Sequence, residues 1–253
     1  MTIDTHAHLE MAEFDNDREA VLARAWEAGL AAIVTVGTTL PDCERAVALA
    51  ERHAPVYGAV GIHPHEVKEI AAGTYERLRQ LARRPKVVAL GEIGLDFFYD
   101  HSPREIQLRC FGEQMALAAE LKLPVIIHDR EAHSETLAVM KAYAGRVRGV
   151  LHCFSGDWAM AKECLALGYD LSIAGPVTYK KSLQLQEVAR RMPLERMVVE
   201  TDCPFLSPQS HRGKRNEPAY VVETATFIAG LRGIPAAEVQ RQTADNARRL
   251  FGF

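Results

Sequence analysis

The chain has 253 residues, of which 48% are hydrophobic and 25% are charged, and its formal net charge is -3. This composition is typical of a folded globular protein, and the acidic balance argues against a protein that coats nucleic acid through a broad basic face. The sequence has no apolar run that could span a bilayer and no signal-peptide pattern, so we expect a cytoplasmic protein without a membrane role. The five scattered cysteines form no C-x-x-C pair, so the sequence indicates neither a disulfide framework nor a thiolate zinc knuckle.

Eight short apolar segments rich in β-branched residues follow one another along the chain. They cover residues 2–8, 31–38, 56–64, 87–96, 123–130, 149–154, 169–175 and 197–204. Helical patterns lie between them at residues 17–28, 41–53, 75–84, 103–121, 134–143 and 158–167, and two more follow at 217–234 and 236–253. Pro41 at a helix start, and Gly29 and Gly168 just past helix ends, support these boundaries.

Eight strand–helix units in about 250 residues match the size of a (β/α)8 TIM-type barrel. No Pro-, Gly- or Ser-rich linker divides the sequence, so we expect an α/β fold with one barrel domain over residues 1–253. A doubly wound open sheet would alternate in the same way, but eight units favour closure. The active site of such a barrel lies at the C-terminal ends of the strands, which makes polar residues at these ends the candidates for chemistry.

The first strand ends in two histidines separated by one residue. Because side chains alternate along a strand, His6 and His8 point to the same face, together with Asp4. Two imidazoles on one face are either a hydrogen-bonded pair or part of a metal site. The other strand ends decide between these two interpretations.

Polar side chains end most of the other strands as well. The full set is His6, His8, His63, His65, Glu92, His128, His152, Glu200 and Asp202. Six of the ten histidines belong to it, although random placement would scatter them over helices and surface. Imidazole and carboxylate ligands together suit Mg2+, Mn2+ or Zn2+. The six residues His6, His8, Glu92, His128, His152 and Asp202 exceed what one ion needs, so we expect two divalent ions with a bridging carboxylate that activate a water for hydrolysis.

The same alternation bears on two cysteines beside these residues. If His152 and Asp202 point inward, Cys153 and Cys203 point toward the helices. This orientation argues against thiolate ligation, and we expect both cysteines to be packing residues.

Five stretches resemble the TatD family of metal-dependent deoxyribonucleases, which belongs to the amidohydrolase-type barrels. They are "DTHAHL", "GEIGLDFFYD", "PVIIHDREAH", "HCFSG" and "ETDCPFLSPQSHRGKRNEP". They occur in the family's order, and the resemblance extends over essentially the whole chain. The resemblance implies that His6, His8 and Asp202 hold one metal ion, that His128 and His152 hold a second, and that Glu92 bridges the two. It also implies that Asp202 accepts a proton from the attacking water, which makes Asp202 and Glu92 the catalytic candidates.

The residues that would contact substrate lie mainly in one loop. The stretch "SHRGKRNEP" carries Arg212, Lys214, Arg215 and Asn216 close to an expected helix start, where they would form a phosphate cradle. The alternative is an ordinary solvated loop.

Three further side chains at strand ends are substrate candidates. His63 and His65 of "GIHPH" would contact the substrate, or else form a hydrogen-bonded pair that shapes the loop around Pro64. Arg130 would meet a phosphate or form an internal ion pair, and Asp96 would orient a ligand histidine.

The resemblance implies a 3'-5' exonuclease that cleaves phosphodiester bonds at single-stranded DNA ends. The alternative is an amidohydrolase or deacylase, acting on amides or aminoacyl-tRNA esters with the same metal centre. The basic loop favours phosphodiesters, because cleavage of a neutral amide needs no cations around its oxygens. A barrel that only binds is a third hypothesis, and the complete set of metal ligands argues against it. Separately, we expect the protein to be a monomer.

Overall fold

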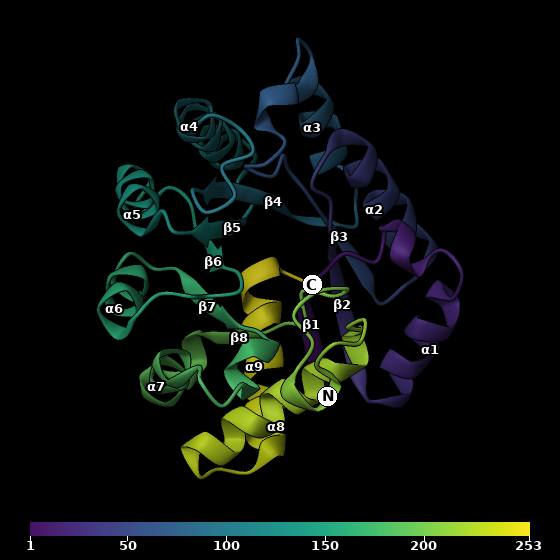
Figure 1. Ribbon diagram of the computed structural model, residues 1–253. Coiled ribbons are helices and arrows are strands. Elements are labelled where there is room, and N and C mark those ends of the chain that lie inside the picture. Colours follow the sequence, from purple (N-terminus) through teal and green to yellow (C-terminus); the bar gives the residue numbers. More distant parts are fainter.

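The computed structural model describes residues 1–253, in which strands and helices alternate along the chain (Figure 1). The strands are β1 (Thr2–Ala7), β2 (Leu30–Val36), β3 (Val56–Val60), β4 (Val87–Asp96), β5 (Val125–Arg130), β6 (Gly149–Leu151), β7 (Asp170–Ile173) and β8 (Met197–Val199). The helices are α1 (Arg18–Glu27), α2 (Leu40–Arg52), α3 (Thr74–Ala82), α4 (Arg104–Leu121), α5 (His133–Ala142), α6 (Trp158–Ala166), α7 (Leu183–Arg191), α8 (Val221–Arg232) and α9 (Ala236–Phe251). None of these helices combines the length and the apolar character that crossing a bilayer would require.

The eight strands form one sheet in chain order, and every neighbouring pair is parallel. The sheet closes between β1 and the segment after β8, where Asp202 N–H donates to the carbonyl oxygen of His6 at 2.9 Å and His8 N–H donates to that of Cys203 at 2.8 Å. Deeper in this seam, the Thr5 hydroxyl donates to the carbonyl oxygen of Val199. The expected (β/α)8 barrel is therefore confirmed.

Local sequence explains where the helices begin and end. The Thr39 hydroxyl accepts the N–H of Asp42 and caps α2, whose first turn contains Pro41. Gly29 and Gly168 follow α1 and α6 with φ angles of 87° and 89°, in the left-handed region that favours glycine. The expected helix boundaries agree with those of the structure to within a few residues.

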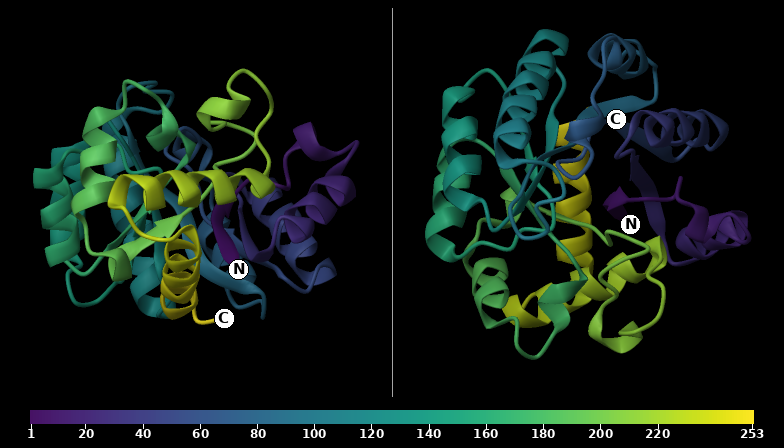
Figure 2. Two further views of the ribbon diagram at one scale, coloured as in Figure 1. Left: turned by 90° about the horizontal axis from the view of Figure 1, so that it is seen from below. Right: turned by 45° about the horizontal axis from the view of Figure 1, so that its top comes forward.

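Helix α9 closes the end of the barrel opposite the polar strand ends. In the left view of Figure 2, it lies at the bottom, while the yellow-green loop after β8 rises at the top. Its Ala244, Ala247, Leu250 and Phe251 share one buried apolar cluster with strand residues such as Ile3, Val88 and Ile126. The Asn246 amide donates to the carbonyl oxygens of Leu194 and Met197 at the start of β8. The barrel interior is thus sealed at one end, and access is left to the other.

Candidate metal centre

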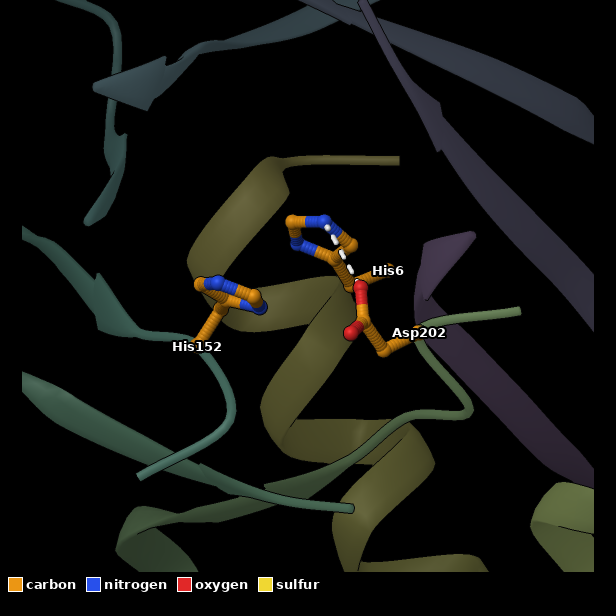
Figure 3. Close-up of side chains that lie close together, drawn as sticks. All are labelled: His6, His152 and Asp202. Carbon is orange, nitrogen blue, oxygen red and sulfur yellow. Dashed lines mark ion pairs between the residues drawn. The ribbon is translucent and has the colours of Figure 1, made fainter. Parts of the chain in front are cut away.

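The two histidines of the first strand meet at the open end of the barrel. His6 is fully buried and His8 is 3% exposed, and their Nε2 atoms lie 3.2 Å apart. Asp202, from the segment after β8, places Oδ1 3.6 Å from His6 Nε2 and 3.4 Å from His8 Nε2. Figure 3 shows Asp202 and His152 on either side of His6, whose ring stacks on that of His152 at 4.0 Å.

Glu92 of β4 lies in the middle of the cluster. Its Oε1 lies 2.9 Å from His128 Nδ1 and 2.8 Å from His152 Nε2. Its Oε2 faces the other way, 3.3 Å from His6 Nε2. All six residues expected to be ligands are therefore brought together around one carboxylate.

The partners of the outward-facing ring nitrogens determine what each histidine presents to the cluster. Nδ1 of His8 donates to the carbonyl oxygen of Val36 at 2.8 Å, and Nε2 of His128 donates to Asp96 Oδ2 at 3.0 Å. A neutral imidazole carries one hydrogen, so the nitrogens that face the cluster, His8 Nε2 and His128 Nδ1, keep their lone pairs. Lone pairs directed at carboxylate oxygens repel them unless a cation lies between, and this donor set therefore fits divalent metal ions.

The pKa values of the buried groups also indicate that the cluster accommodates a cation. Burial raises the pKa of Glu92, but the imidazoles of His152, His63 and His6 outweigh it and hold that pKa well below its usual range. Burial lowers the pKa of His152, but the carboxylates of Glu92 and Glu200 outweigh it and hold this pKa well above its usual range. The cluster therefore holds positive charge against its carboxylates, and a divalent cation can supply that charge in place of protons.

Two buried carboxylates behind the cluster were assigned no role from the sequence, although Glu200 was among the polar strand-end residues. Glu200 Oε1 accepts the N–H of Cys153 at 2.6 Å and lies 3.3 Å from Nδ1 of His152. Glu10 accepts the Thr35 hydroxyl at 2.6 Å, and its other oxygen lies 3.4 Å from Nδ1 of His8. Each lies two residues in sequence from a candidate ligand, His8 or Asp202, and this spacing is the signal that could have assigned them a role.

Asp96 ends β4 and connects two histidines. Its Oδ2 accepts from His65 Nε2 at 2.9 Å as well as from His128, while its Oδ1 accepts the N–H groups of Phe98 and Tyr99. His65 is therefore turned toward Asp96. His63 is turned toward the cluster, with its Nε2 3.5 Å from Glu92 Oε1.

Cys153 differs from its expected orientation. It lines a cleft of about 450 Å³ beside His128, His152 and Asp202, and does not point toward the helices. The reason is that β6 ends at Leu151 and Cys153 has φ of 43°, so the alternation of an extended strand no longer applies. Cys203 is buried, as expected for a packing residue.

The basic loop does not gather its side chains at one point. Arg215 forms a bidentate ion pair with Asp17, the residue that precedes α1. Asn216 is buried, with its amide donating to the carbonyl oxygens of Thr201 and Phe205. Arg212 stacks on the ring of Tyr179 at 4.6 Å, and Lys214 is exposed.

Arg130 lies on the same open end of the barrel as the cleft. It is exposed and stacks on the rings of Phe98 and Tyr99, at 4.2 and 4.7 Å. Phe98 and Tyr99 are 57% and 50% exposed as whole residues, so an aromatic surface with a cation lies at the rim of the cleft.

Comparison with known proteins gives one consistent result. Residues 3–252 match the family model described as TatD related DNase. The chain is 41% identical over 252 residues to the uncharacterized metal-dependent hydrolase YabD of Bacillus subtilis, with 99% of each chain covered. It is 39% identical over 255 residues to the 3'-5' ssDNA/RNA exonuclease TatD of Enterobacter lignolyticus, with 98% of each chain covered. Among solved structures, the TatD homolog YJJV of Escherichia coli K12 superimposes with a TM-score of 0.94 at 34% identity, covering 100% of this chain and 98% of the other.

Proposed function

This chain belongs to the family of TatD-related DNases and is a metal-dependent hydrolase of ester bonds, and we propose that it is a 3'-5' exonuclease on single-stranded DNA ends. The convergence of six imidazole and carboxylate side chains at the open end of the barrel carries this proposal. The relatives named as 3'-5' ssDNA/RNA exonucleases support its substrate and polarity. RNA ends are accordingly included in the substrates to be compared.

We assign the ligands by the two directions in which Glu92 faces. One oxygen is directed to His6, and the other is directed to His128 and His152, as a carboxylate shared by two ions requires. His6, His8 and Asp202 would hold one ion, and His128 and His152 the other. Bound divalent ions supply a water of lowered pKa and stabilise charge during in-line displacement at phosphorus. Asp202, whose Oδ1 lies beside His6 and His8, would accept a proton from the attacking water.

The surroundings of the cleft support a nucleic acid strand as substrate. Phe98 and Tyr99 offer exposed ring faces at its rim, and stacking on such faces holds unpaired bases without regard to sequence. Arg130 on these rings, together with Arg212 and Lys214 on the loop after β8, would contact phosphate oxygens. We leave Arg215 and Asn216 out of this role, because their polar groups are already bound within the protein.

The test uses metal-stripped protein, a 5'-labelled single-stranded DNA 20-mer and added Mg2+, Mn2+ or Zn2+. The expected product is a ladder that shortens by single nucleotides from the 3' end, while the same oligomer labelled at its 3' end releases labelled mononucleotide. Asp202→Asn should abolish this activity, and Asp245→Asn on the exposed side of α9 is the matched control. Cleavage of amides or aminoacyl esters without cleavage of DNA or RNA would overturn the proposal.

A further inference from the structure

His63 lies beside the candidate metal centre, and its contacts bear on whether it is a metal ligand. Its Nε2 lies 3.5 Å from Glu92 Oε1, its ring centroid lies 4.6 Å from that of His128, and the residue is only 9% exposed. Potential ligand atoms of these three residues lie within 4.8 Å of one another, which would allow His63 to act as a further metal ligand. The hydrogen-bonding partner on the other side of its ring argues against that role.

The backbone N–H of His65 donates to Nδ1 of His63 at 3.1 Å. The two residues flank Pro64, and the chain turns there so that this N–H faces back onto the ring. Because Nδ1 accepts this hydrogen bond, it carries no hydrogen of its own, and the hydrogen of the neutral ring must be on Nε2. A doubly protonated ring is excluded by the same contact, since two N–H groups would then face each other.

The hydrogen-bonding pattern of the His63 ring is thus the reverse of that of His8 and His128. His8 and His128 have oxygen acceptors behind them, namely the Val36 carbonyl and the Asp96 carboxylate, and these fix lone pairs toward the centre. His63 has a donor behind it, and its Nε2 presents a hydrogen to the centre. A nitrogen that carries a hydrogen has no lone pair to give to a metal ion.

We propose that His63 is a catalytic hydrogen-bond donor and not a metal ligand, with its Nε2–H bound to a non-bridging oxygen of the scissile phosphodiester. This rests on the proposed function for the identity of the substrate. The donor transfers no proton, and it stabilises the negative charge that grows on this oxygen during displacement. Burial makes such a fixed donor more effective than water would be, because it needs no reorientation.

Substitution at His63 separates the two roles. His63→Leu should lower kcat by about 10²- to 10³-fold, the usual effect of removing one transition-state donor, and leave the number and affinity of bound Mn2+ ions unchanged by calorimetry. His63→Gln, which restores an N–H near the same point, should recover at least about tenfold of the lost rate. His128→Ala provides the contrast, since loss of a ligand should weaken Mn2+ binding. His53→Gln, at the residue that follows α2, should change neither kcat nor Mn2+ binding.

A second measurement needs no variant to fold and no turnover. In zinc-loaded protein with 15N-labelled histidines, His63 should show a hydrogen on Nε2 and none on Nδ1. Loss of a metal equivalent in His63→Leu, or a His63 ring whose Nε2 is unprotonated and metal-bound, would overturn the proposal. If the wild-type protein does not cleave DNA or RNA, the proposed function fails, while the metal count and the nitrogen spectrum still decide between donor and ligand.

Discussion

Asp202 N–H donates to the carbonyl oxygen of His6 at 2.9 Å, so the first and the last of the proposed ligands come from hydrogen-bonded neighbouring backbones. Directly behind them, the N–H and hydroxyl of Thr201 donate to the buried carboxyl group of Asp4 at 2.9 and 2.6 Å. The ligand set therefore spans the seam at which the barrel closes. A cation bound here would hold the two ends of the sheet together.

Metal binding is accordingly expected to stabilise the fold. At a free Mn2+ concentration 100-fold above Kd, linkage predicts about 2.7 kcal/mol of added stability, and this raises the Tm of a domain of this size by about 5 to 10 °C. Calorimetry of the EDTA-treated protein with and without Mn2+ measures the shift. The Asp202→Asn variant should lose most of this Tm shift. An equal Tm shift in wild type and variant would show that metal binding does not stabilise the seam.

Glu92 should be the most sensitive position of the centre. Glu92→Gln keeps the side-chain volume but removes the charge that faces His6 on one side and His128 and His152 on the other. We expect a loss of bound metal from both positions and a fall in kcat of roughly 10³-fold, because the displacement depends on both ions. Metal content by mass spectrometry and single-turnover cleavage measure the two effects.

The matched control is Glu120→Gln on α4, an exposed carboxylate paired with Arg79. It should leave both quantities at their wild-type values. Full metal content in Glu92→Gln would contradict the bridging assignment.

The sequence was sufficient to predict the barrel and the convergence of the cluster, and the reason is geometrical. In a closed parallel sheet, the end of each strand faces the same opening, so His6, Glu92 and His152 must approach one another once their strands are recognised. The two-residue alternation then selects the inward face without any knowledge of the loops. It does not extend past the end of a strand, which is why the orientation of Cys153 was wrongly predicted.

Loop side chains could not be predicted, because their partners lie far away in the sequence. Nothing near Arg215 indicates that Asp17, just before α1, will pair with it. Nothing near Asn216 indicates that its amide will donate to the carbonyl oxygens of Thr201 and Phe205. The tautomer of His63 is a further case, since it depends on one backbone N–H that turns back onto the ring. Such contacts follow from the assembled fold and not from local sequence patterns.

The closed end of the barrel depends on another buried carboxylate. Asp170, at the start of β7, is 3% exposed and accepts hydrogen bonds from Arg196 and from Arg249 of α9. Asp170→Ala should lower the free energy of unfolding by about 2 kcal/mol, because both arginines lose their partner while remaining partly solvated. Urea unfolding measures the loss.

Two comparisons test this assignment. Arg249→Met should cost less than Asp170→Ala, since the Arg249 side chain is 50% exposed. Mn2+ affinity should be unchanged in both variants, because α9 lies at the other end of the barrel. An unchanged urea midpoint for Asp170→Ala would contradict a role for this carboxylate in anchoring α9.

Arg215 was expected to bind phosphate, but its contacts in the structure indicate a different role. A phosphate cradle requires a free guanidinium, but Arg215 bonds both oxygens of Asp17, at 2.9 and 2.6 Å, and stacks on Phe14. Arg215→Met should therefore leave KM for single-stranded DNA within about twofold of wild type and lower stability by less than about 1 kcal/mol, as for a solvent-screened ion pair.

The pH dependence of the stability loss in Arg215→Met tests whether the broken ion pair with Asp17 causes it. Hydrogen bonds from Arg215 lower the pKa of Asp17 in the folded state, so the pair contributes stability above the unfolded-state pKa of about 3.9 and loses it as pH falls through the folded value. The difference in unfolding free energy between wild type and Arg215→Met should be complete at pH 7 and shrink below pH 4. In protein that carries Asp17→Asn, the Arg215→Met substitution should cause no such difference in unfolding free energy at any pH. A tenfold rise in KM with unchanged stability would instead indicate that Arg215 binds the substrate. The ion pair with Asp17 would then have to open when DNA binds.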